Sequence, residues 1–195
     1  DNLPQIKARL DGIKEDVDEM DELVNQLLNY ANFDQSNPEL NWKQGDMLSL
    51  SQQIVRRLQA NNSQAGIPTK VEFHELSPNS NARFFCDWIL MERAVLNLIQ
   101  NALRHCDKTV NISLDNRDGQ YTIIVDDDGS GIPEGSRTEV FESFVRLRNV
   151  NEVQSSGFGL GLTIVRRISQ WHPGDVKASD SPQGGARFTL TWKRP

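Results

Sequence analysis

Residues 121–133 read YTIIVDDDGSGIP, an apolar run that ends in three consecutive acids and two glycines. The run from Tyr121 to Val125 predicts a strand, and the acids mark its end. Glycine lets the backbone turn and approach a bound molecule closely, while a neighbouring carboxylate can accept a hydrogen bond from an exocyclic amine such as that of adenine. The alternatives are an ordinary acidic turn or a calcium loop, although the ligand spacing of a twelve-residue calcium loop is missing.

Upstream of this stretch, a predicted buried helix from Asp87 to about His105 carries two carboxamides. Asn97 and Asn101 lie one helical turn apart on the same face, so both can point at one ligand or one hydrated metal ion. Oxygen donors of this kind suit magnesium. Taken alone, the pair supports a ligand-binding role and a structural role as caps or cross-links equally well.

Downstream, residues 157–162 read GFGLGL and lead directly into a helix predicted from about Leu160 to Trp171. Backbone N–H groups at a helix N-terminus bind anions. The loop is not a Walker motif, because it lacks the Gly-Lys-Ser/Thr ending, and it is not a dinucleotide fingerprint after a strand. By itself it is typical of a flexible turn.

The remaining pattern predicts an α/β fold without internal repeats. Leu50, Ile54 and Leu58 are four residues apart and indicate a second helix. A turn at residues 116–119 joins two strands into a hairpin. The predicted strands are 69–76, 83–86, 110–114, 121–125 and 186–192.

The N-terminus predicts one long helix with a single apolar seam. Its apolar positions alternate four and three residues apart, as in heptads, which favours pairing with another helix over packing on its own domain. Asn37-Pro38 then breaks the helix, which places a domain boundary near residues 34–45. The seam comprises Ile6, Leu10, Ile13, Val17, Met20, Val24, Leu27 and Ala31.

Composition excludes several other classes. Hydrophobic residues make up 37% and charged residues 25% of the chain, as in globular proteins, and a net charge of -6 argues against a nucleic-acid-binding surface. Cys86 and Cys106 lack CxxC spacing, so we expect neither a disulfide framework nor a zinc site. No stretch approaches about 18 apolar residues, so we expect no membrane span here.

In their order and spacing, these motifs resemble the N, G1, F and G2 boxes of histidine kinases. The series consists of the Asn pair, the Asp-Gly-x-Gly loop, the aromatic segment 140–144, the glycine-rich helix start and the closing segment 184–188. The resemblance covers roughly residues 48–192. It implies an α+β two-layer sandwich, a mixed sheet against helices, with ATP held between a helix and a lid.

The resemblance also implies roles for individual residues. Asn101, with Asn97, would hold Mg2+, and Arg104 would reach the phosphates. Asp127 would bind the adenine amino group, and His105 would lie beside the nucleotide. The other expected nucleotide-binding residues are Gly129, Gly131, Ile132, Phe144, Arg146, Gly157, Phe158, Gly159, Leu160, Gly161 and Leu162.

The lid would run from about Phe141 to Gly157. Within it, Arg146 or Arg148 would touch the γ-phosphate, and the sequence leaves both alternatives open. ATP-hydrolysing relatives of the same fold carry a Glu one turn before the magnesium-binding Asn, where this chain has Asn97. Because an amide cannot act as a general base, transfer to a separate acceptor is favoured over hydrolysis.

The acceptor histidine is expected outside this chain. His74-Glu75-Leu76-Ser77-Pro78 looks like an H-box at first sight, but its Pro comes one residue early and the segment reads as a strand. His172 reads as a loop residue beside Pro173. The helix from about Leu3 to Phe33 instead resembles the second stem helix, so we expect a stem helix in 1–36 and a catalytic ATP-binding domain in 37–195.

These expectations combine into one leading hypothesis. The chain would bind ATP and Mg2+ and phosphorylate a stem histidine, from which a response regulator takes the phosphoryl group. The full-length protein would form a homodimer through its stem, and would be a membrane sensor whose catalytic part is cytoplasmic. The alternative is a catalytically silent nucleotide-binding regulatory or dimerisation module, for which His105, where the family more often has an aromatic residue, and the unusual lid at 149–154 leave room.

Overall fold

The computed structural model describes residues 6, 7, 9, 12, 13, 17, 20, 38–61, 69–76, 83–146 and 159–194. The chain divides into two compact units, Asp1–Ser36 and Asn37–Pro195. In the first unit every described residue is helical. The apolar side chains of Ile6, Ile13, Val17 and Met20, the described members of the predicted seam, are 50 to 64% exposed. The pairing of this helix with another helix stays a prediction.

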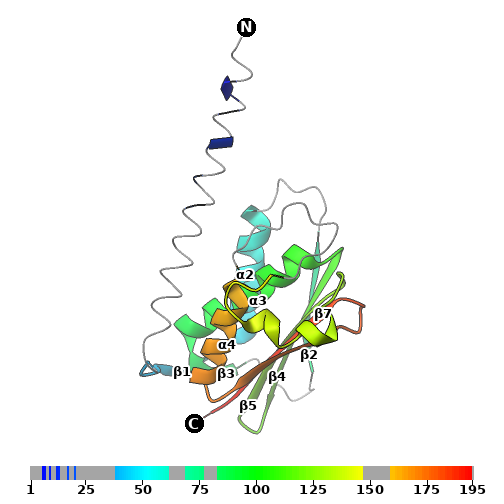
Figure 1. The fold of residues 1–195 in the computed structure, drawn as a ribbon. Helices are drawn as coiled ribbons and strands as arrows, with labels where there is room; N and C mark the ends of the chain where they lie inside the picture. Colours follow the sequence, from blue (N-terminus) through cyan, green and yellow to red (C-terminus); the bar gives the residue numbers. More distant parts are fainter. Residues whose placement is uncertain are drawn as a thin grey trace. The chain divides into compact units, whose positions relative to one another are not determined.

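The second unit is built on a five-stranded sheet with the strand order β2-β4-β5-β7-β6 (Figure 1). β2 and β4 run parallel, and every other neighbouring pair is antiparallel, so the sheet is mixed. The strands are β2 Lys70–Glu75, β4 Thr109–Arg117, β5 Gln120–Asp127, β6 Asp175–Asp180 and β7 Ala186–Lys193. β1 Trp42–Asp46 and β3 Arg83–Asp87 form a separate antiparallel pair.

The helices form a second layer, which confirms the two-layer α/β fold. α3 packs against β5, α4 packs against α3, β6 and β7, and α2 packs against α3. Figure 1 shows the three helices together on one side of the sheet. They are α2 Met47–Asn61, α3 Trp88–His105 and α4 Gly161–Trp171, with short 3-10 turns η1 Glu134–Ser136 and η2 Glu139–Phe141.

α3 is the central helix of the layer because most of its apolar side chains are buried. Its buried positions include Val95, Leu98 and Ile99, which are inaccessible to solvent. Asp87 begins the helix by accepting hydrogen bonds from the N–H groups of Ile89 and Leu90. A buried, capped helix of this kind holds the polar side chains on its remaining face in fixed positions.

The predicted helices and strands of the second unit are confirmed, but two strands were not predicted. β1 and β6 read WKQGD and DVKASD, with too few apolar residues to show alternation. β6 is an edge strand in which only Val176 is buried, and charged side chains are common on sheet edges. Their hydrogen-bonding partners, rather than their own composition, make these segments strands.

The prediction that His172 is a loop residue is confirmed, since it lies in the turn that ends α4, but its burial was not predicted. His172 caps the C-terminus of α4 and is fully buried. Its Nε2 accepts a hydrogen bond from the Asp87 N–H at 3.0 Å, and its Nδ1 lies 2.9 Å from the Ile168 carbonyl oxygen, to which it donates. The imidazole therefore joins the end of α4 to the start of α3. None of the described helices is both long and apolar enough to cross a membrane.

Candidate functional site

Asp127, the last residue of β5, is buried, and only one of its two carboxylate oxygens has a hydrogen-bond partner among the described residues. Its Oδ1 accepts hydrogen bonds from the N–H groups of Gly129 and Ala186, both at 3.0 Å. Its Oδ2 is also buried and has no hydrogen-bond partner among the described residues. Burial raises the pKa of this carboxyl, although the two N–H groups oppose the rise. Buried acceptors are nearly always paired, so Oδ2 suits an N–H donor from a ligand.

The two neighbouring acids have different, structural tasks. Asp126 forms a two-point ion pair with Arg187 across β5 and β7, with N···O distances of 2.7 and 2.9 Å. The Oδ1 atom of Asp128 accepts three backbone N–H groups, from residues 107, 108 and 109, at 2.9 to 3.0 Å. Burial disfavours the Asp128 carboxylate, but these N–H groups keep its pKa below the usual value. Of these three consecutive acids, only Asp127 therefore has a buried oxygen without a partner among the described residues.

Two glycines allow the backbone to close tightly around Asp127. A Cβ on Gly129 would lie 1.8 Å from the His105 carbonyl oxygen, and a Cβ on Gly185 would lie 2.2 Å from Asp127 Oδ1. Any side chain at either position would displace the backbone or the carboxylate. The loop after β5, the end of α3 and the β6–β7 turn therefore meet at Asp127.

A second junction brings Asn97 to the start of α4. A Cβ on Gly161 would lie 2.7 Å from Asn97 Oδ1, so the amide oxygen lies directly against the glycine loop. The Asn97 Nδ2 donates to the Arg93 carbonyl at 2.8 Å, which fixes the orientation of the amide. No side chain of the described residues caps the N-terminus of α4. Its first backbone N–H groups therefore suit an anion such as a phosphate.

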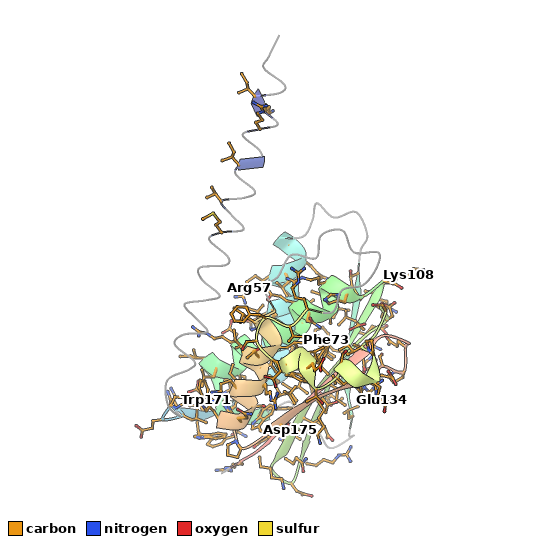
Figure 2. The ribbon with its side chains drawn as sticks, in the orientation of Figure 1. Arg57, Phe73, Lys108, Glu134, Trp171 and Asp175 are labelled. Atoms are coloured by element: carbon orange, nitrogen blue, oxygen red, sulfur yellow. The ribbon has the colours of Figure 1, made fainter. Side chains whose placement is uncertain are left out.

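The remaining expected ligands on α3 lie further along the same helix. Asn101 and His105 are partly buried, and Arg104 is exposed. The described ranges hold no group of three His, Cys, Asp or Glu side chains that could bind a metal ion. The expected magnesium donors are carboxamide oxygens, which are hard ligands that magnesium accepts. Figure 2 places Lys108, just after α3, and Glu134 on the same side of this unit, and Trp171 on the other.

The aromatic segment joins the glycine loop to the core. Phe141 is buried and packs edge-to-face against Phe188 at 6.1 Å. Phe144 has a positive φ of 64° and is 58% exposed, and its N–H donates to the Gly159 carbonyl at 3.0 Å. The Glu142 carboxylate also pairs with Arg166 of α4 at 2.7 Å. The described part of the expected lid is thus anchored at its start.

The other expected site residues differ in how deeply they are buried. Leu160 is buried, whereas Leu162 and Ile132 are partly buried and Arg146 is exposed. Gly131 has a positive φ of 71°, and a Cβ there would lie 3.4 Å from the Gly185 carbonyl oxygen. Gly157, Phe158 and Arg148 lie outside the described residues, so their roles stay predictions.

Sequence reasoning gave no role to Gly185, Ala186 and Arg137. Gly185 and Ala186 lie in the closing Gly-Gly segment, which was noticed only as part of the resemblance, yet the Ala186 N–H holds Asp127. Arg137 donates to the Ile132 carbonyl at 3.3 Å and pairs with Asp180. Nothing in the sequence around Arg137 signals this position, because Asp180 lies 43 positions away and is brought to it by the fold.

Comparison with known proteins gives one family model and many relatives. Residues 86–195 match the model described as "Histidine kinase-, DNA gyrase B-, and HSP90-like ATPase". Sensor protein RstB of Escherichia coli (strain K12) is 37% identical over 194 residues, which is 98% of this chain and 42% of RstB. Sensor histidine kinase CpxA of the same organism is 41% identical over 101 residues, which is 51% of this chain and 22% of CpxA. The chain thus spans less than half of either relative.

Solved structures of other proteins have the same fold as this chain. Full-length ShkA in complex with AMPPNP superposes with a TM-score of 0.77 and 26% identity, over 95% of this chain and 38% of that chain. The mycobacterial sensor histidine kinase MprB gives a TM-score of 0.61 and 26% identity, over 78% of this chain and 98% of that chain.

Proposed function

Because this chain belongs to the family of histidine kinase-, DNA gyrase B- and HSP90-like ATPases, we propose that it is the ATP-binding catalytic part of a sensor histidine kinase. Residues 37–195 bind Mg-ATP and transfer the γ-phosphoryl group to a histidine on a helical stem. A response regulator then takes the phosphoryl group. The proposal rests above all on the buried Asp127 Oδ2, which has no hydrogen-bond partner in the described part of the chain.

Asp127 supplies the base-recognition step. Its Oδ1 is already held by two backbone N–H groups, so Oδ2 is the atom left to accept the exocyclic N–H of adenine. Gly129 and Gly185 keep the surroundings free of side chains. A guanine would present a carbonyl oxygen where adenine presents its amine, and two acceptors would then face each other in a buried position. The site therefore favours adenine.

The opposite end of the site supplies phosphate recognition. The uncapped N-terminus of α4 offers backbone N–H groups, and Asn97 lies against it. Asn97 and Asn101 would hold magnesium, which when bound neutralises charge on the phosphates. Arg104, with Arg146 or Arg148, would pair with the phosphate oxygens. The mutual position of base site and phosphate site is fixed by α3, which touches both.

Phosphoryl transfer is favoured over hydrolysis because no general base stands beside the phosphate site on α3. The only carboxylate of α3 is Glu92, which pairs with Arg57 of α2 at 3.6 Å. Asn97 occupies the position next to the glycine loop, and an amide does not accept a proton at neutral pH. Water is therefore poorly activated, and a histidine imidazole supplied by another segment is the better nucleophile.

We place the phosphate acceptor in a stem segment outside this chain. Of the three histidines in the sequence, His74 lies on β2, His172 is fully buried and His105 ends α3. The first unit, Asp1–Ser36, would be the second stem helix, and its apolar seam, whose described members are exposed, would pair into a homodimer. The whole protein would be a membrane-anchored sensor with this part in the cytoplasm.

The decisive experiment supplies the missing acceptor. The chain is mixed with a separately prepared stem that carries an H-box helix, and with γ-labelled ATP. We expect acid-labile, alkali-stable label on the stem histidine, and none when that histidine is replaced by Gln. ATP binding in calorimetry without any labelling of a folded, dimeric stem would contradict the kinase and favour the catalytically silent module.

A further inference from the structure

Arg137 links two loops that both touch Asp127. Its Nε donates to the Ile132 carbonyl at 3.3 Å, in the loop that follows β5. Its Nη2 donates to an oxygen of Asp180, the last residue of β6. The Arg137 side chain is only 25% exposed, so most of it is enclosed by these loops. A single guanidinium therefore spans the two segments, and its planar fork suits such a bridge.

Both segments continue directly into the base site. Asp180 is the register partner of Ala186, whose N–H donates to Asp127 Oδ1 at 3.0 Å. On the other side, Ile132 belongs to the loop after β5, which also contains Gly129, whose N–H is the second donor to Asp127 Oδ1. The two N–H groups that hold the carboxylate thus come from the two segments that Arg137 joins.

We propose that Arg137 is a positioning residue for nucleobase recognition, a role that rests on the proposed function above. By holding the Ile132 loop against the end of β6, Arg137 keeps the Gly129 and Ala186 N–H groups at a fixed separation. Asp127 then keeps its orientation, with Oδ1 bound by both N–H groups and Oδ2 directed at the base amine. Ala186 is also held by the β5–β7 ladder, so loss of the bridge loosens mainly the loop that carries Gly129, and the orientation of the carboxylate is then less strictly fixed.

The exposure of the Arg137–Asp180 ion pair indicates how much ATP affinity the loss of Arg137 should cost. Asp180 is 75% exposed, so water screens its charge, and an ion pair of this kind is worth little by itself. The Ile132 contact adds a second, less exposed hydrogen bond. We therefore expect a loss of ATP affinity of roughly threefold to tenfold on removal of the guanidinium, rather than a collapse of binding.

The test compares two nucleotides that differ only in the group that Asp127 recognises. Calorimetry measures the Kd of ATP and of purine riboside triphosphate, which lacks the 6-amino group, for the wild type and Arg137→Gln. In the wild type, ATP binds more tightly. In Arg137→Gln, ATP affinity falls while that of the purine analogue changes little. The specificity ratio, which is the Kd of the purine analogue divided by the Kd of ATP, therefore falls toward one. Transfer to the stem at saturating ATP keeps its kcat.

Matched variants separate positioning from general destabilisation. Arg117→Gln is the control: it removes the same charge from an ion pair with Asp115. This pair lies at the C-terminal end of β4, whereas Asp127 lies beside its N-terminal end, so the specificity ratio should not change. Asp180→Asn removes the other charge of the same ion pair and should also lower the specificity ratio. Because Asp180 is exposed, this variant replaces Arg137→Gln in the test if Arg137→Gln does not fold. Adding Asp180→Asn to Arg137→Gln should lower the ratio no further than the larger single effect.

The outcomes also separate this inference from the function on which it rests. A wild type that binds neither nucleotide overturns both. A wild type that prefers ATP, together with an Arg137→Gln variant that weakens both nucleotides by the same factor or neither, overturns only the role of Arg137.

Discussion

The backbone carbonyl oxygen of His105 fills the space in which residue 129 would carry a side chain: a Cβ built on Gly129 would lie 1.8 Å from it. His105 ends α3, and Gly129 lies two residues beyond the end of β5. This contact sets the distance between the helix that carries Asn97 and Asn101 and the strand that presents Asp127. Both halves of the proposed nucleotide site therefore depend on the lack of a side chain at Gly129.

Gly129→Ala should disturb this contact. The added methyl group must push back the backbone at the end of α3, which should lower the free energy of unfolding by about 1–3 kcal/mol and weaken ATP binding. Urea denaturation and calorimetry measure the two effects. Gly135→Ala is the matched control, because a Cβ there meets nothing within 4 Å. Equal stability and ATP affinity in the two variants would show that the loop relaxes freely.

Asp127→Asn should weaken ATP binding roughly tenfold to hundredfold, because a charged acceptor for the base amine is replaced by an amide. The amide oxygen can still accept the Gly129 and Ala186 N–H groups, so the fold should persist. Asp118→Asn, in the β4–β5 turn, makes the same change away from the site and should bind ATP normally. Unchanged affinity in a calorimetric titration of Asp127→Asn would remove the assigned base site.

Asn101→Ala should abolish the part of ATP affinity that depends on magnesium. The wild type should bind ATP more tightly with Mg2+ than with EDTA, whereas the variant should show a single, weaker affinity in both. Gln100→Ala, on the exposed side of α3, is the control and should keep the magnesium effect. If the wild type binds ATP with the same affinity in Mg2+ and in EDTA, Asn101 binds no metal.

His172 should make stability depend on pH. Burial lowers the pKa of its imidazole, because the charged form is disfavoured and the neutral Nε2 accepts the Asp87 N–H. The unfolded chain then binds a proton more readily, so the stabilisation is complete above the unfolded pKa of about 6.5 and is lost as the pH falls through the lower folded pKa.

His172→Gln should lower the free energy of unfolding by about 1–3 kcal/mol at pH 7.5, since buried hydrogen bonds are lost. Between about pH 7.5 and 5.5 the variant should lose less stability than the wild type does, because its buried imidazole is gone. Urea denaturation at the two pH values gives both numbers. His74→Gln, on the exposed part of β2, should follow the wild type. Parallel pH profiles for His172→Gln and the wild type would refute this role.

The sequence motifs predicted the main elements because their patterns are local. The predicted turn lies at Asp118-Gly119, with positive φ angles of 50° and 76°. The helix predicted from Asp87 is α3, which Asp87 caps. β6 could not be predicted, since only its pairing with β7 makes the charged segment a strand. The burial of His172 could not be predicted for a related reason: the Asp87 N–H that binds its ring lies 85 positions away in the chain.

The sequence by itself determined that three acids and two glycines end a strand, that two carboxamides share a helix face, and that a glycine-rich loop starts another helix. Only the tertiary structure decided which acid is available to a ligand. Asp126 pairs with Arg187, and Asp128 accepts N–H groups of the backbone after α3. Of these three acids, only Asp127 keeps a buried oxygen without a partner among the described residues. The physical reason is that hydrogen-bond partners from distant segments, and not the neighbouring residues, set the environment of each carboxylate.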